Sequence, residues 1–338
     1  MAEPLYISCL SLVCPVGLTP ESAAAAMRAG IDGFSDLPYV DNEGEPIVGA
    51  IVPGLPHDLR GRARLVELLA RAVDGIEARL PPDLKLNRLP LLLCTREPER
   101  PGARVNGLVT EVEARLGVDF RRDGSGHIAR GPVAAFESIT QVRRILAERR
   151  ADAYLIAAVD TLVDARSLYW LDHAKRLKTS VQTDGVIPGE AACVVFVTKR
   201  PMTPSHLAVR GLGFAEETAT VLNEEPLLGK GMAAAVKGAL AEASVAMHEV
   251  DFRLSDVAGE SYAFEELVLA QSRLMRKTRE SQDLWHPAGF VGDCGAAAGL
   301  VQFAWAEQAF ARSYAPGPVA LVHGSAAAGA RAAVVVGT

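Results

Sequence analysis

The feature that most constrains the fold is an alternation of short, wholly apolar runs with longer amphipathic segments. The apolar runs lack the polar alternation of half-exposed strands, so they predict strands that are buried on both faces of a sheet. The segments between them carry apolar residues at helical spacing. Predicted strands cover 5–13, 89–94, 153–159, 192–198, 207–215, 252–259 (running into a loop), 319–324 and 332–337. Predicted helices cover 62–80, 136–150, 165–177, 230–250, 262–275 and 295–311.

This order of strand and helix predicts an α/β fold with mainly parallel sheets covered by helices. Both halves of the chain close on strand pairs that carry small residues, and the polar segment KRPMTPSHLA (199–208) with its two prolines separates them. The simplest account is a duplicated α/β unit. We therefore predict an N-terminal half over 1–203 and a C-terminal half over 204–338, forming one compact unit.

The charge balance argues against two kinds of partner. A formal net charge of −6 does not suit nucleic-acid binding, which needs a basic face. The densest basic run, RILAERRAD (144–152), is typical of the solvated C-terminal end of a helix, where cations are favoured. The first apolar run is too short to cross a bilayer and ends in Pro-Val-Gly, so we expect no membrane anchor.

The cysteines and glycines show no pattern of a metal or cofactor site. Cysteines occur at 9, 14, 94, 193 and 294, with no CxxC pair. Free thiols without a disulfide framework or a zinc site favour a reducing, cytoplasmic compartment. The glycine-rich stretch GSGHIARG (124–131) follows no predicted strand, so we interpret it as a turn and not a phosphate loop. We expect no cofactor and no metal.

Six segments carry a family resemblance that runs in order over nearly the whole chain. They are LYISCLSLVCPVGLTPESAAAAMRAGIDGFSD (5–36), VQTDGVIPGEAACVVFV (181–197), VRGLGFAEE (209–217), DVAGESYAFEE (256–266), GFVGDCGAAAG (289–299) and LVHGSAAAGARAAVVV (321–336). Together they resemble the motifs of the β-ketoacyl synthases of the thiolase superfamily. The resemblance implies a thiolase fold, with two similar halves in five layers, α-β-α-β-α, and a dimer formed through the sheet of the first half.

In active members of that family, a cysteine at a helix N-terminus attacks an acyl thioester, and two histidines, or a histidine and an asparagine, stabilise the charge that develops. The resemblance places the cysteine at or next to Pro132, the first histidine at Gly259 and the second at Asp293. Proline cannot attack a thioester, and glycine has no side-chain donor. A carboxylate repels an enolate unless the carboxyl group is held protonated in an apolar site. The resemblance therefore implies a condensing-enzyme scaffold with degenerate catalytic positions.

Cys294 and His323 are the fallback candidates for chemistry. The GAAAG sequence after Cys294 opens a predicted helix whose N-terminus could lower the pKa of the thiol, although a small packed thiol is the simpler interpretation. His323 stands where the family has an asparagine, although a satisfied structural loop histidine is the simpler interpretation. Ser261 is expected to be the N-cap of the helix that follows it, with acidic residues in the first turn.

These residues leave three hypotheses of function open. The leading hypothesis is a non-catalytic ketosynthase-like protein that acts by protein binding. It would be the silent partner of an active synthase in a thiolase-fold heterodimer, or a homodimeric accessory or adaptor protein of a bacterial effector-secretion system with a protein client. The alternative is an acyl-thioester transferase or hydrolase resembling a 3-oxoacyl-ACP synthase. It would use Cys294, with Asp293 or His323 as base, on acyl-CoA or acyl carrier protein. A third hypothesis is non-covalent binding of an acyl ligand in a vestigial pocket.

Overall fold

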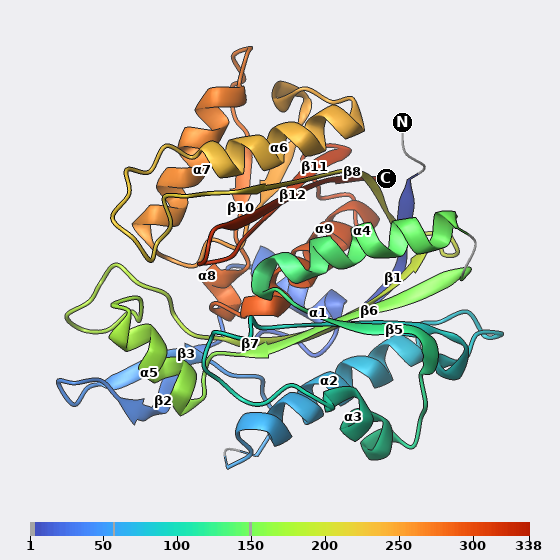
Figure 1. Ribbon diagram of the computed structural model, residues 1–338, viewed down its shortest axis with the longest axis horizontal. Coiled ribbons are helices and arrows are strands. Elements are labelled where there is room, and N and C mark those ends of the chain that lie inside the picture. The colour runs from blue at the N-terminus through green and yellow to red at the C-terminus, as the bar shows by residue number, and fades with distance from the viewer. Residues whose placement is uncertain (1–3, 57, 149–150) are drawn as a thin grey trace.

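The protein is described by a computed structural model that covers residues 4–56, 58–148 and 151–338 (Figure 1). Within these residues, ten strands form one continuous sheet in the order β10-β9-β11-β12-β8-β1-β7-β6-β4-β5, and β2 pairs with β3 in a separate hairpin. The strands are β1 (Leu5–Val13), β2 (Phe34–Val40), β3 (Pro46–Ala50), β4 (Pro90–Thr95), β5 (Arg121–Ala129), β6 (Ala153–Thr161), β7 (Glu190–Thr198), β8 (Leu207–Glu216), β9 (Phe252–Leu254), β10 (Asp283–Trp285), β11 (Val319–Ser325) and β12 (Ala330–Gly337).

Helices cover both outer faces of the sheet and fill the space between its two wings (Figure 1). Helices α6 and α7 lie over the wing formed by β8 to β12, and α2 and α3 lie over the wing formed by β1 and β4 to β7. Between the wings lie α1, α4 and α9. The helices are α1 (Pro20–Arg28), α2 (Gly61–Glu77), α3 (Leu108–Leu116), α4 (Ala134–Ala147), α5 (Ala165–His173), α6 (Lys230–Ala243), α7 (Ser261–Leu274), α8 (Ala288–Val291) and α9 (Ala298–Ala311). The predicted α/β fold with five layers is thus confirmed. The expectation of mainly parallel sheets is wrong, because five of the nine neighbouring strand pairs in the large sheet are antiparallel, among them β1 with β7 and β6 with β7.

The two wings meet at β1. This strand pairs antiparallel with β7 over nearly its whole length, but it pairs with β8 only through Leu5, Tyr6 and Ile7. The sheet can therefore diverge beyond Ile7, and the central helices occupy the space that opens. Residues 298–309 of α9 are all buried, which is expected of a helix that contacts protein on every side.

Three apolar cores correspond to these layers. The central core joins both wings and contains Phe136 of α4 and Phe303 of α9, whose rings lie 5.8 Å apart in an edge-to-face arrangement. A second core packs α2 against the first wing. A third packs α6 and α7 against the second wing. No helix in the described ranges has both the length and the apolar character needed to cross a membrane.

The predicted strands are all present, and the helices differ from expectation mainly in their bounds. The predicted helix over 230–250 ends at Ala243, because Ser244 adopts a left-handed conformation with φ 55° and a 3-10 turn follows. The predicted helix over 136–150 starts earlier, as α4, and ends at Ala147. Arg149 and Arg150, which contribute to the predicted basic end of that helix, lie outside the described residues.

Two local predictions are wrong. The stretch 124–131, predicted as a turn, contributes residues 124–129 to β5, which runs parallel to β4 with Leu92 opposite Gly126. It lies at the edge of the sheet with most residues exposed, so it lacks the apolar run by which buried strands are recognised. The predicted N-cap role of Ser261 is also wrong. Helix α7 begins at Ser261 itself, whose backbone N–H donates to Asp184 Oδ1 at 2.7 Å.

Candidate functional site

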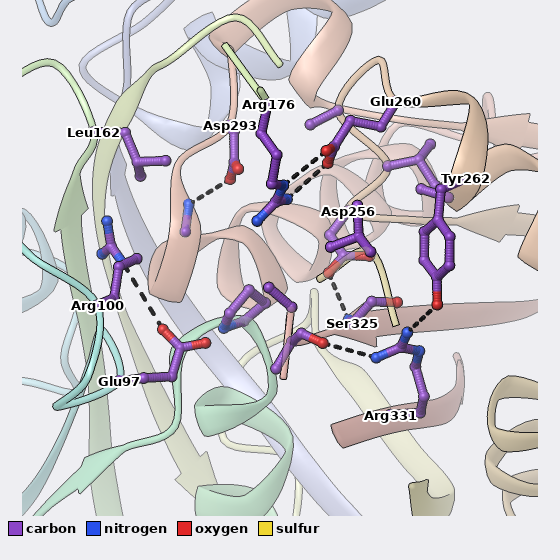
Figure 2. Close-up of a pocket in the computed structure, with 18 of the residues that line it drawn as sticks. Glu97, Arg100, Leu162, Arg176, Asp256, Glu260, Tyr262, Asp293, Ser325 and Arg331 are labelled. Atoms are coloured by element: carbon purple, nitrogen blue, oxygen red, sulfur yellow. Dashed lines mark hydrogen bonds and ion pairs between the residues drawn. The ribbon is translucent and has the colours of Figure 1, made fainter. Parts of the chain in front are cut away.

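A cavity of about 90 Å³ lies between the two wings, where the N-terminal tips of α4 and α9 face loops from both halves of the chain (Figure 2). Its charged and polar lining comes from several elements. The lining residues used below are Glu97, Arg100, Pro132, Arg176, Asp256, Glu260, Tyr262, Asp293, Gly295, Ser325 and Arg331. The cavity therefore lies where the family resemblance places a catalytic site, but most of these side chains are ionisable.

Both helix tips are built in the same way. A 3-10 turn over Gly131–Val133 leads into α4, and a second one over Gly295–Ala297 leads into α9. Each turn opens on a glycine in the left-handed region, with φ 55° at Gly131 and 50° at Gly295. A Cβ atom at Gly131 would collide with the Glu97 carboxylate, and one at Gly295 would collide with the Asp160 carboxylate. A carboxyl group thus lies directly against each tip.

At the tip of α9, the backbone donors are already occupied. The Ala296 N–H donates to Asp160 Oδ2 at 2.9 Å, and the Gly295 N–H donates to Asp293 Oδ1, also at 2.9 Å. Free N–H groups at a helix N-terminus are a natural binding site for anions, including an oxyanion that develops during a reaction. Because Asp160 and Asp293 hold these two donors, they are not free for a substrate.

Three arginines in or beside the cavity each have a carboxylate of their own. Arg100 Nη2 contacts both carboxylate oxygens of Asp160. Arg176 donates to both oxygens of Glu260 at 2.7 Å, which joins a first-half loop to the start of α7 (Figure 2). Arg331 Nε donates to Glu266 at 2.8 Å. Arg331 Nη2 also donates to the Tyr262 hydroxyl at 2.9 Å. These pairs are largely buried, so each rigidly fixes one wall of the cavity.

Three further carboxyl groups line the cavity without a dedicated arginine. Burial raises the pKa of Asp256 to about 7, and the charge of Asp293 adds to this effect. Burial also raises the pKa of Asp293, against the opposing effects of the Gly295 N–H, Arg176 and Arg100. Glu97 lies 3.7 Å from Arg100, and burial raises the pKa of its carboxyl group. The cavity therefore holds an excess of acid over base.

The structure brings two of the three predicted catalytic positions together. Pro132 and Asp293 both line the cavity. Gly259 lies beside it between two lining residues and has φ 116°, and a Cβ atom there would lie 2.7 Å from the Gly185 carbonyl oxygen. Any side chain at this position would be strained, so the site has no room for an imidazole from residue 259 without rearrangement.

The two fallback residues lie in different layers, Cys294 in the central core and His323 on the outer side of the second wing. Cys294 is 3% exposed, in the central core, and burial raises the pKa of its thiol well above the usual range, with a further contribution from Asp293. His323 of β11 is 2% exposed and lines a small cavity with Met232 and Leu267, on the α6 and α7 side. Burial, together with the charge of Arg253, lowers the pKa of His323 to about 3. This arrangement does not supply Cys294 with His323 as a base.

Sequence reasoning missed most of the ionisable lining, including Arg100, which lies in the loop after β4 and is only 8% exposed. One signal was available. Strands β4 and β6 are parallel neighbours, so residues at their C-terminal ends meet at one edge of the sheet. Asp160 lies at the end of β6, and Glu97 and Arg100 follow β4.

Comparison with known proteins gives structural matches. No protein-family model matches the chain. No curated protein matches its sequence. Among solved structures, a chain from the complex of the ketosynthase AntDE and the acyl carrier protein AntF of a type II polyketide synthase matches with a TM-score of 0.81, at 14% identity over 100% of both chains.

Two further matches come from named bacteria. The complex of the ketosynthase ApeO and its chain length factor ApeC from Xenorhabdus doucetiae matches with a TM-score of 0.75, at 14% identity over 99% of this chain and 98% of that chain. The ketosynthase from module 6 of the bacillaene synthase of Bacillus subtilis 168 also matches with a TM-score of 0.75, at 12% identity over 99% of this chain and 72% of that chain. At these identities the likeness shows the fold: the chain has the thiolase-like fold of ketosynthases and of ketosynthase and chain length factor proteins.

Proposed function

We propose that the protein is a non-catalytic, ketosynthase-like protein that acts by binding another protein. One observation carries this proposal: among the described residues, neither a cysteine nor a histidine lines the cavity at the helix tips. A condensing reaction needs a nucleophile there and donors that stabilise negative charge. Glu97, Asp256 and Asp293 line it instead, and in their ionised form they carry the opposite charge.

The enzymatic alternative depends on Cys294, and its test is covalent acylation. We expect no mass increase when the protein is incubated with acetyl-CoA, palmitoyl-CoA or an acylated carrier protein and analysed by intact-mass spectrometry, because a buried thiol with a raised pKa is a poor nucleophile. The Cys294→Ala variant is the matched control. An adduct on the unmodified protein that is lost in Cys294→Ala would establish the enzyme and refute the proposal.

The type of partner is part of the same proposal. The matched structures include a ketosynthase in complex with its chain length factor and a ketosynthase in complex with an acyl carrier protein. By analogy, we propose that this chain forms a dimer with a second thiolase-fold chain, and acyl carrier protein is a further candidate partner. A silent synthase partner forms a heterodimer, whereas an adaptor of a secretion system forms a homodimer that binds a client protein. We also propose a reducing, cytoplasmic location. The division of the chain into an N-terminal half that ends at residue 203 and a C-terminal half that starts at residue 204 is part of the proposal as well.

Strand β5 offers an edge for such a dimer. It is the last strand of the first wing, and within the described residues no strand pairs with it on the side away from β4. Asp123 lies in its irregular part, between the pairings Pro90 with Arg121 and Leu92 with Gly126, and its side chain is 87% exposed. Proline at this position would remove one edge N–H at little expense to the fold.

The test is the oligomeric state of Asp123→Pro compared with that of Asp123→Ala, which keeps the N–H. We expect the unmodified protein and Asp123→Ala to be dimers by light scattering, and Asp123→Pro to shift toward monomer with an unchanged circular dichroism spectrum. Dimers of equal stability in all three proteins would show that pairing does not use this edge. Native mass spectrometry with a co-expressed ketosynthase would then separate the heterodimer from the homodimer.

A further inference from the structure

A small recess beside the main cavity has an unusual lining. It has a volume of about 10 Å³, and it is lined by Asp256, Pro287, Ala288, Gly292, Asp293, Cys294, Ala298 and Gln302. We call it the Gln302 recess. It shares Asp256 and Asp293 with the main cavity, so the two spaces adjoin. Its volume matches one water-sized group.

The polar side chains of the Gln302 recess present oxygen acceptors. Gln302 is fully buried, and its Nε2 donates to the His323 carbonyl oxygen at 3.0 Å, which turns Oε1 away from that bond. Within the described part of the chain, this Oε1 has no hydrogen-bond partner. A buried amide oxygen without a donor is costly, by about 1–3 kcal/mol, so the position calls for a donor group.

Asp256 presents a second buried oxygen acceptor that lacks a hydrogen-bond partner within the described ranges. Its Oδ2 accepts from the Ser325 N–H at 2.6 Å. Its Oδ1 is enclosed and has no partner among the residues that the structure describes. Asp293 uses Oδ1 to accept from Gly295 and has Oδ2 as a further acceptor. The donors among the recess side chains are the weakly polar thiol of Cys294 and the amide NH2 of Gln302, which is directed at the His323 carbonyl oxygen.

The charges around the recess also favour a cation. Six carboxyl groups line the main cavity or pair with its arginines: Glu97, Asp160, Asp256, Glu260, Glu266 and Asp293. Three arginines oppose them: Arg100, Arg176 and Arg331. Pairing each arginine with its own carboxylate leaves three carboxyl groups, and two of these, Asp256 and Asp293, line the Gln302 recess.

We propose that the Gln302 recess binds the primary ammonium group of a small amine, with the remainder of the amine in the main cavity. An ammonium group carries three N–H donors and no acceptor, which matches Gln302 Oε1, Asp256 Oδ1 and Asp293. A water molecule has only two hydrogens to donate and leaves the excess negative charge uncompensated. A bare metal cation would find only three oxygens here, fewer than hard cations prefer. This proposal goes beyond the protein-binding role and stands without it.

The test uses methylammonium chloride as the probe, with tetramethylammonium chloride at the same concentration as the matched salt, because the latter has no N–H and is too large for the recess. We expect methylammonium to raise the thermal unfolding temperature of the full chain in a saturable way, by about 2–5 °C, while tetramethylammonium does not. Potassium chloride forms a third arm. An equal rise with tetramethylammonium or with potassium, or no rise with methylammonium, would overturn the proposal.

Three variants localise the effect. Asp256→Asn and Gln302→Met each remove one acceptor, and we expect at least a tenfold weaker apparent affinity for methylammonium in isothermal titration calorimetry. Asp283→Asn makes the same change of charge at an exposed position of β10, and we expect it to bind as the unmodified protein does. If Asp256→Asn fails to fold, Gln302→Met decides alone. Unchanged affinity in folded Gln302→Met would refute the assignment to this recess, whatever the outcome of the acylation test.

Discussion

The tips of α4 and α9 share one backbone geometry and differ in what they do with it. Both start with a left-handed glycine and a 3-10 turn, and both have a carboxyl group against that glycine. At α9 the carboxylates of Asp160 and Asp293 accept from backbone N–H groups. At α4 the second residue of the turn is Pro132, which has no N–H to donate. At α9 carboxylates therefore occupy the backbone donors, and at α4 one donor is absent.

The largest effect is expected for Asp160, which occupies a backbone donor at the tip of α9. Asp160→Ala removes the acceptor for the Ala296 and Thr161 N–H groups and leaves Arg100 buried without its main partner. We expect the free energy of unfolding to fall by about 3–5 kcal/mol, measured by urea denaturation. Asp123→Ala, which breaks an exposed pair with Arg121, is the control and should cost less than about 1 kcal/mol. A loss below 1 kcal/mol for Asp160→Ala would show that the ion pair does not hold this tip.

A second prediction compares the two glycines directly. Gly131→Ala and Gly295→Ala should each cost about 2–3 kcal/mol in urea denaturation, from left-handed strain plus a clash with a carboxylate. Gly117 has φ 67° and open space where a Cβ atom would lie, so Gly117→Ala should show the strain alone, about 1 kcal/mol. Adding Glu97→Ala should relieve part of the loss in Gly131→Ala, because it removes the atoms that collide. No relief would mean that strain, and not Glu97, dominates at α4.

The excess of carboxyl groups between the tips predicts a pH dependence. Asp256 has a raised pKa of about 7 in the folded protein, so the native state binds its proton more tightly than the unfolded chain does. Stability should therefore fall as the pH rises from about 4 to 7, and it should level off above 7. Asp256 is partly exposed, so we expect its share to be roughly 1–2 kcal/mol. Asp256→Asn should flatten this dependence in unfolding experiments at pH 5 and pH 8, whereas Asp283→Asn should leave it unchanged.

The smallest effect concerns Pro132. Pro132→Cys restores a thiol at the α4 tip, and we expect stability to change by less than about 1 kcal/mol, since a proline at a compatible helix start contributes little more than unfolded-state entropy. We also expect no acylation by acetyl-CoA in intact-mass spectrometry, because Glu97 lies beside the tip and the lining includes no imidazole among the described residues. An acyl adduct on Pro132→Cys would show that the scaffold lacks only its nucleophile.

The fold was predictable because its signals are local and repeated. Buried strands such as β6 and β7 are apolar over most of their length, and the central helix α9 is mostly apolar, so the sequence pattern predicts each of them. The edge strand β5 was missed because exposure removes that signal. The positions Pro132 and Asp293 came from the order of motifs, and both line the cavity.

The charged part of the site was not predictable in the same way. Arg176 and Glu260 are 84 residues apart, and their pairing depends on how two loops from different halves meet. A single sequence carries no periodic signal for such a contact. The same holds for Gln302, which looks like an ordinary polar residue in an apolar helix until its unpaired oxygen is seen beside Asp256.

The position of β1 has a consequence for how the chain folds. This strand lies in the middle of the sheet, yet Ser8 of β1 bonds to Thr198, a partner 190 residues further along the chain. Because β1 precedes β7 and β8 in the chain, its two edges stay uncovered during synthesis until those strands have been made. Contacts of such long range slow folding, and an uncovered apolar strand is prone to aggregate. We therefore expect β1 to be the segment on which chaperones act while the protein is being made.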